Sequence, residues 1–175
     1  MTAEMREGGG ARIAQATPAD ARVVAQLLRE FNAEFDTPAP PLETLTRRFA
    51  ALLSLDDAAV FLALDARGED ESGEGGSGEG RPIGFAYLTL RPSPYYDGPI
   101  ALLEELYVAP GLRGRGIGSL LMGEMHRFLA ERGCGEIQIN VDAVDADARR
   151  FYERHGFSNF ETGQDYRMLC YIKEL

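Results

Sequence analysis

The sequence is short of cysteine, of basic residues and of long apolar runs. Its 175 residues include two cysteines, Cys134 and Cys170, which are too few for a disulfide framework and lack the spacing of a zinc site, so no metal site is predicted. Lysine and arginine together number 18 against 28 aspartates and glutamates, a formal net charge of −10. This imbalance argues against nucleic acid as a partner, because the phosphate backbone would be repelled. The negative net charge of the protein suits a cationic small molecule better than a nucleic acid.

No stretch approaches the roughly 18 consecutive apolar residues that a membrane-spanning helix needs, and the first ten residues lack the apolar run of a secretory signal. We therefore expect a soluble, cytoplasmic protein with no membrane partner. Hydrophobic residues make up 45% of the chain, enough to bury a core, and the length corresponds to one domain.

Composition divides the chain into a tail and a single domain. Residues 1–10 are polar and Gly-rich and are predicted to form a flexible tail, and residues 11–175 form the domain. Within that domain, residues 67–81 (RGEDESGEGGSGEGR) consist almost wholly of Gly, Ser, Glu and Asp. Such a segment buries too little surface to offset the entropy of ordering it. We interpret it as a mobile loop inside one domain, and less readily as a linker between two.

Hydrophobic periodicity predicts a mixed α/β fold. Thr17, Pro18 and Asp20 have the pattern of a helix start, and apolar residues then recur at helical spacing to Phe35. The other predicted elements are a second helix near 45–53, a hairpin of strands 58–66 and 83–90, strands at 11–17, 102–108, 136–141 and 166–172, and helices at 116–132 and 147–154. Strand, helix and strand in that order require a locally parallel strand pair.

A glycine-rich stretch lies between the strand at 102–108 and the helix that follows. Gly114, Gly116 and Gly118 alternate with other residues there, and the free N–H groups at a helix start attract anions. Arg113 and Arg115 add positive charge, so a phosphorylated ligand is expected. The spacing fits neither a Walker loop nor a dinucleotide fingerprint. A turn that merely reverses the chain is the alternative.

The same residues resemble a known family. Arg113, Gly116 and Gly118 match the Arg/Gln-x-x-Gly-x-Gly/Ala signature of the GCN5-related N-acetyltransferases, and residues 148–157 (ARRFYERHGF) match that family's Ala-x-x-Phe-Tyr-x-x-x-Gly-Phe segment. The resemblance implies a central, mostly antiparallel sheet with a parallel strand pair splayed around the cofactor, flanked by helices. A weaker similarity, in the strand at 104–108, is to the diamine and polyamine acetyltransferases. Asp145 departs from the family, which often has Asn there.

The resemblance also implies a reaction, transfer of acetyl from acetyl-CoA to a primary amine by direct attack in a ternary complex. It implies that coenzyme A is held by the strand end and the glycine-rich stretch, that is, by Leu106, Tyr107, Val108, Arg113, Gly114, Arg115, Gly116, Ile117, Gly118 and Ser119. Backbone N–H groups near Leu106 would hold the acetyl oxygen, and Tyr152 would protonate the departing thiolate.

A protonated amine must lose a proton before it attacks, and carboxylates suit that task. Because side chains alternate along a strand, Glu104 and Glu105 are predicted to point to opposite faces, so only one would face the acetyl group. The resemblance favours Glu104 as the base or as a water relay, and Glu105 as a second catalytic acid that binds the amine; which of the two is the base stays open. Glu34 and Asp36 are further candidates for binding a cation.

The predicted activity is thus N-acetylation of a small basic amine. Two alternatives remain: a protein or peptide amine as the acceptor, and a module that binds coenzyme A without turnover. The sequence is also compatible with a homodimer and does not identify the acceptor.

Overall fold

A computed structural model describes residues 7, 8, 10–65 and 80–173. The chain divides into two compact units, residues 1–138 and 139–175. Most of the predicted loop at 67–81 and most of the predicted tail lie outside the described residues. In the part of the chain that is described, no helix is long and apolar enough to cross a membrane.

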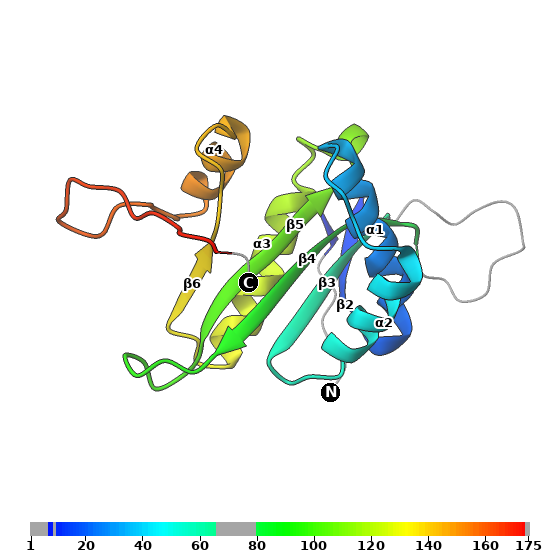
Figure 1. The fold of residues 1–175 in the computed structure, drawn as a ribbon, viewed down its shortest axis with the longest axis horizontal. Coiled ribbons are helices and arrows are strands. Elements are labelled where there is room, and N and C mark those ends of the chain that lie inside the picture. The colour runs from blue at the N-terminus through cyan, green and yellow to red at the C-terminus, as the bar shows by residue number, and fades with distance from the viewer. Residues whose placement is uncertain (1–6, 9, 66–79, 174–175) are drawn as a thin grey trace, which may run out of the picture. The chain divides into compact units, whose positions relative to one another are not determined.

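One sheet forms the centre of the first unit, with its strands in sequence order from β1 to β6. The strands are β1 (Glu7–Gly8), β2 (Ala11–Gln15), β3 (Ala58–Asp65), β4 (Pro82–Arg91), β5 (Ile100–Val108) and β6 (Glu136–Ile139). Successive pairs from β1 to β5 are antiparallel, whereas the arrows of β5 and β6 run the same way (Figure 1). The predicted mixed sheet with a parallel pair is therefore confirmed.

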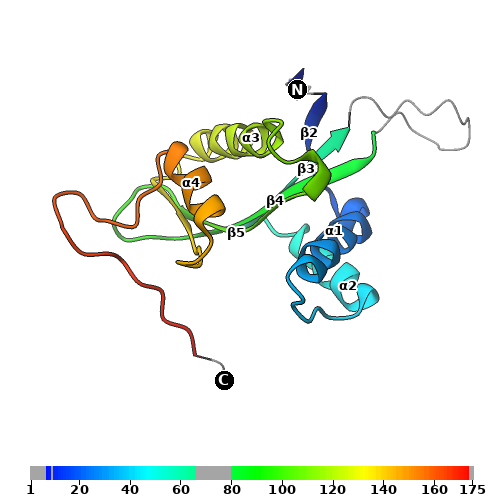
Figure 2. The ribbon, with the colours of Figure 1, turned by 90° about the horizontal axis from the view of Figure 1, so that it is seen from above.

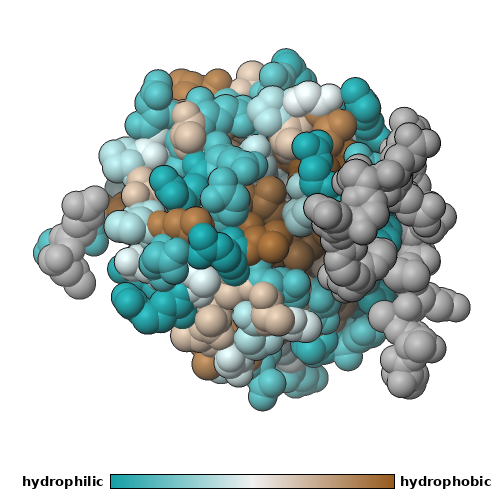
Figure 3. Space-filling view, turned by 90° about the vertical axis from the view of Figure 1, so that its right-hand side faces the viewer, coloured by the Kyte–Doolittle hydropathy of each residue, from teal (hydrophilic) through white to brown (hydrophobic). Residues whose placement is uncertain are grey.

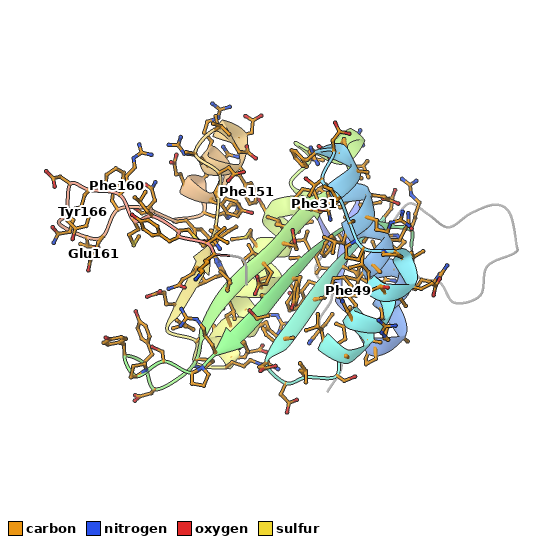
Figure 4. All side chains as sticks on the ribbon, in the orientation of Figure 1. Phe31, Phe49, Phe151, Phe160, Glu161 and Tyr166 are labelled. Atoms are coloured by element: carbon orange, nitrogen blue, oxygen red, sulfur yellow. The ribbon has the colours of Figure 1, made fainter. Side chains whose placement is uncertain are left out.

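Helices cover both faces of this sheet. Figure 2 shows α1 (Ala21–Glu34) and α2 (Leu42–Leu52) on one face and α3 (Ile117–Glu131) on the other. Phe31 and Phe49, labelled in Figure 4, come from α1 and α2, and Phe49 packs edge-on against Tyr87 of β4. On the opposite face, Phe128 of α3 packs against Phe61 of β3. Each face of the sheet therefore has its own apolar layer.

Local sequence explains where α1 begins and ends. A short 3₁₀ turn, Pro18–Asp20, precedes the helix, and the backbone N–H and hydroxyl of Thr17 both donate to Asp20 Oδ2 at 2.8 Å, which satisfies a group that a helix start leaves unpaired. Val24 and Leu27 of the predicted stripe are buried, but Phe35 lies beyond the helix end and is 56% exposed.

Figure 3, which looks at the side where α1 and α2 lie, shows a mainly hydrophilic surface with hydrophobic residues gathered near its centre.

Within the segment predicted as a flexible tail, Glu7 and Gly8 pair with Arg12 and Ala11, next to Gly10 at φ +80°. One predicted element is wrong. The predicted last strand at 166–172 does not form. Its one described pairing is an isolated bridge between Phe160 and Arg167, and Leu169 is 71% exposed. An alternating apolar pattern is local, whereas a strand also needs a partner edge.

The second unit contains α4 (Ala146–Arg154) and the segment that follows it. Asp145 caps this helix, since its Oδ1 accepts from the N–H of Ala148 at 2.9 Å. Asp145, the residue that departs from the family pattern, therefore serves as a helix N-cap here. Gly156, at φ +86°, follows the helix where the sequence predicted its end. Phe160, Glu161 and Tyr166 lie in the segment beyond (Figure 4).

Candidate active site

The glycine loop, residues 113–119, joins the end of β5 to α3 through a short turn, Pro110–Leu112. Gly114 and Gly116 have φ values of +73° and +84°, in the left-handed region that favours glycine, and a Cβ at either position would meet nothing within 4 Å. Gly116 is the N-cap of α3, and the N–H of Leu120 donates to its carbonyl at 3.0 Å. An α-helix leaves its first N–H groups outside its own hydrogen-bond ladder, and α3 begins beside the open space at Gly116.

The side chain of Arg113 points to a protein partner. Its Nη1 and Nη2 donate to the two carboxylate oxygens of Glu34 at 2.5 and 2.6 Å, and its Nε donates to the carbonyl of Val108 at 2.8 Å. The guanidinium also lies 5.9 Å from the centre of the Tyr107 ring. Two residues that the sequence assigned to different ligands, Arg113 to the cofactor and Glu34 to the amine, are thus bound to each other.

A β-bulge in β5 determines the position of the two central carboxylates. Tyr87 of β4 pairs with Glu105, but the next residue, Leu88, pairs with Leu103, so Glu104 is the extra residue. Glu105 shares a face with its partner Tyr87, which is the face covered by α2. The hydroxyl of Thr89, two residues further along β4 and therefore on that same face, donates to Glu104 Oε1 at 2.7 Å.

Both carboxylates therefore lie on the face of the sheet that α1 and α2 cover. The prediction that only one of Glu104 and Glu105 would do so is wrong, because a bulge interrupts the alternation on which it depended. The sequence also missed Tyr87, which lies opposite Glu105 in the register of β4, and Thr89, whose hydroxyl reaches Glu104. Neither residue carries a motif, so no sequence signal marks them.

Burial and charge change the acidity of this group. Glu105 is half-buried, and its pKa is raised from 4.5 to about 7, first by burial and then by the charge of Glu104. The pKa of Tyr87 is raised by burial and then by Glu104, Asp57 and Glu105. Glu105 is thus a carboxyl group poised to gain or lose a proton near neutral pH, with an acidic neighbour that is exposed to solvent.

The side chains at the end of β5 differ in how deeply they are buried. Tyr107 is 3% exposed, and its ring contacts Phe31 at 5.4 Å and Phe85 at 6.3 Å between centroids. Its pKa is raised by burial and by Glu30 and Glu34, and lowered by Arg113. The side chain of Tyr107 therefore belongs to the core, and of the predicted cofactor strand only its backbone and its half-buried neighbours Leu106 and Val108 remain for a ligand.

The remaining predicted residues lie in different settings. Asp36 follows the end of α1, is exposed, and has φ +50°, the one positive value among described residues other than glycine. Tyr152 is 9% exposed on α4, and its ring packs against Phe151 and Phe157 at 5.2 and 5.6 Å. It belongs to the second unit, and its role in proton transfer stays a prediction.

Comparison with known proteins identifies the family. The model of the acetyltransferase (GNAT) family matches residues 24–157. An aminoglycoside N(6')-acetyltransferase type 1 of Stenotrophomonas maltophilia is 33% identical over 160 residues, covering 89% of this chain and 92% of that protein. A crystal structure from Arthrobacter sp. FB24, described in general terms as an acetyltransferase, is 42% identical with a TM-score of 0.80, over 93% and 95% of the two chains.

A more distant structure shares the fold. An aminoglycoside acetyltransferase from an uncultured soil metagenomic sample, in complex with sisomicin, is 22% identical with a TM-score of 0.71, over 95% and 97% of the two chains. The family match covers the glycine loop, both carboxylates and Tyr152. This chain belongs to the acetyltransferase (GNAT) family.

Proposed function

We propose that this protein transfers acetyl from acetyl-CoA to a primary amine of a small basic acceptor. The observation that carries the proposal is the position of Glu104 and Glu105 on one face of β5, the strand that leads into the glycine loop. The two groups provide negative charge for an ammonium group and a carboxylate that exchanges protons near neutral pH. The relative from Stenotrophomonas maltophilia, named for aminoglycosides, makes an aminoglycoside the first acceptor to test.

The glycine loop fits the phosphate groups of coenzyme A. Gly114 and Gly116 leave open space where side chains would otherwise block close approach, and α3 begins at Ile117, directly after Gly116, where the first backbone N–H groups of a helix favour an anion. Bound acetyl-CoA would supply an acetyl group activated as a thioester. The backbone of residues 113–119 would hold its pyrophosphate, and Arg115, which is exposed, would add positive charge.

We assign the proton transfer to Glu105. An amine with a pKa near ~10 arrives as an ammonium ion at neutral pH and must lose a proton before attack. A base works best when its own pKa lies near the operating pH. Burial and the charge of Glu104 raise the pKa of Glu105 to about 7, close to that pH. Glu104, exposed and held by Thr89, would bind the ammonium group. This reverses the roles that the family resemblance favoured.

Two further groups would complete the reaction. Backbone N–H groups near Leu106 would stabilise the negative charge that develops on the acetyl oxygen. The phenol of Tyr152 would return a proton to the departing sulfur, as the family resemblance implies, because a group with an ordinary pKa near ~10 keeps its proton at neutral pH.

The test is acetyl transfer by the purified protein to a panel of amines. Thiol release is measured with an aminoglycoside, a polyamine and a lysine peptide, corrected for hydrolysis of acetyl-CoA, and the products are identified by mass spectrometry. We expect amine-dependent release with at least one small polycation. Transfer only to the peptide would indicate a protein acceptor, and binding of coenzyme A without transfer to any amine would indicate a module that lacks turnover.

A further inference from the structure

The last turn of α1 touches β5 and the glycine loop through two side chains on one side of the helix. Phe31 stacks on Tyr107 at 5.4 Å, and Glu34, three residues later, holds Arg113 through two hydrogen bonds. Residues three apart lie on the same helix face. The end of α1 is thus fixed both to the end of β5 and to the first residue of the glycine loop.

The charge of Glu34 is unusual for its position. It is the last residue of α1, where the helix dipole favours a cation and disfavours a carboxylate. Its side chain is 25% exposed and that of Arg113 is 44% exposed, so solvent partly screens the ion pair. The pairing with Arg113 offsets the unfavourable interaction of this carboxylate with the helix dipole. Only arginine can make this two-pronged contact while its Nε also binds the carbonyl of Val108.

The chain turns sharply directly after this ion pair. Asp36 has φ +50°, and the turn is closed by three amides: Phe35 N–H donates to Asn32 at 3.1 Å, Asp36 N–H to Ala33 at 3.4 Å, and Thr37 N–H to Asn32 at 2.9 Å. Aspartate adopts this conformation more readily than most non-glycine residues, and the three hydrogen bonds hold it there. The Glu34–Arg113 pair links this turn to the glycine loop.

We propose that Arg113 is a positioning residue, whose ion pair with Glu34 couples binding of an anionic ligand on the glycine loop to the conformation of the turn at 34–37. A ligand that orders the backbone of the glycine loop also orders Arg113. Arg113 in turn holds Glu34, and Glu34 begins the turn at 34–37. Arg115 and the loop amides bind the anion. The guanidinium of Arg113 does not bind it; it connects the loop to Glu34, so that ordering the loop also orders the turn at 34–37. The inference rests on the proposed function only for the identity of the ligand, coenzyme A.

Hydrogen exchange at the amides of residues 35–37 tests the coupling without any acceptor. In the unmodified protein, saturation with coenzyme A or with inorganic pyrophosphate should slow their exchange by about 5-fold or more, the lower end of typical coupling between sites. In E34Q and R113K this protection should be lost, although both variants still bind coenzyme A. R113K keeps the charge but cannot form the two-pronged contact.

Two controls isolate the ion pair. E43Q breaks a different ion pair of α1, the more exposed, single contact between Arg22 of α1 and Glu43 of α2 at 2.8 Å, and should leave the protection unchanged. R115Q should weaken binding of coenzyme A yet retain full protection once saturated. Without ligand, E34Q should already speed exchange at 35–37 relative to E43Q.

The outcomes separate this inference from the proposed function. Protection at 35–37 that survives in E34Q, or that is absent in the unmodified protein at saturation, would overturn the coupling. If ligand binding protects the amides of residues 35–37 as expected but the protein acetylates no amine, the proposed function is overturned and the coupling is not. Failure of the unmodified protein to bind either ligand would contradict both.

Discussion

The carboxylates in the middle of β5 and the glycine loop that follows this strand are proposed to bind ligands of opposite charge, and they differ in which chemical groups would do so. Glu104 and Glu105 act through side chains, one exposed and one half-buried, so their behaviour depends on pKa. The loop acts mainly through the backbone, with Gly114 and Gly116 at positive φ, so its behaviour depends on conformation. If the proposed function is right, one strand contributes to binding both a cationic and an anionic ligand, and substitutions in the two regions should have different effects.

The largest effect is expected at the carboxylate that carries the proton. Glu105→Gln cannot accept a proton and should lower turnover by roughly 10²- to 10⁴-fold, the scale of a positioned base. In the unmodified protein, turnover should rise with pH through about 7 as Glu105 loses its proton, and this step should disappear in the variant. Glu104→Gln is the control and should chiefly raise the KM for the amine. Wild-type turnover in Glu105→Gln would show that another base operates.

A change at the glycine loop should affect binding rather than chemistry. Gly116→Val forces a β-branched residue to φ +84°, which L-residues strongly disfavour, so the loop should shift and the Kd for coenzyme A should rise by about 10-fold or more. The protein should stay folded, because a Cβ there meets nothing within 4 Å. Gly111→Val, with no Cβ contact within 4 Å and no positive φ, is the matched control. Calorimetry that finds equal affinity in both variants would contradict the assignment of the loop.

A smaller effect is expected at Thr89. Thr89→Val removes the hydrogen bond to Glu104 Oε1 while keeping the shape of the side chain. Losing one such bond should raise the KM for the amine by about 2- to 12-fold, with turnover little changed. Thr89→Ser keeps the hydroxyl and should restore the wild-type KM, and a failure of serine to do so would mean that packing of the threonine methyl, rather than the hydrogen bond, matters.

The smallest effect concerns stability. The pKa of Glu105 is about 7 in the folded protein and ordinarily 4.5. Between pH 4.5 and about 7, the folded protein therefore binds more protons than the unfolded chain. The contribution to stability is present below pH 4.5 and is lost as pH rises to about 7. Glu105→Gln should therefore flatten the fall of Tm over this window, as measured by calorimetry. A parallel fall in both proteins would assign the pH dependence to other groups.

The two regions also differ in how far sequence could predict them. The glycine loop is local: alternating glycines, a strand before and a helix after define its geometry, and the helix begins at Ile117, one residue from the expected start. The relation of Glu104 to Glu105 depends on how β5 pairs with β4. A bulge leaves no local signature here, so alternation gave the wrong faces.

Long-range contacts explain the other differences. The pairing of Arg113 with Glu34 joins residues 79 positions apart, and each alone suggested a ligand of opposite charge. The segment at 166–172 has the composition of a strand but lacks a paired edge among the described residues. Helix starts such as Thr17 and ends such as Gly156 were predictable, because their contacts lie within a few residues.

The position of both carboxylates on one face is tested most directly by measuring the pKa of Glu105 with ¹³C NMR, in the unmodified protein and in Glu104→Gln. We expect a value of about 7 in the unmodified protein and a lower one in the variant, because removal of the neighbouring charge leaves burial as the main cause of the shift. A value near the ordinary 4.5 in both proteins would contradict the shared face and the assignment of Glu105 as the proton acceptor.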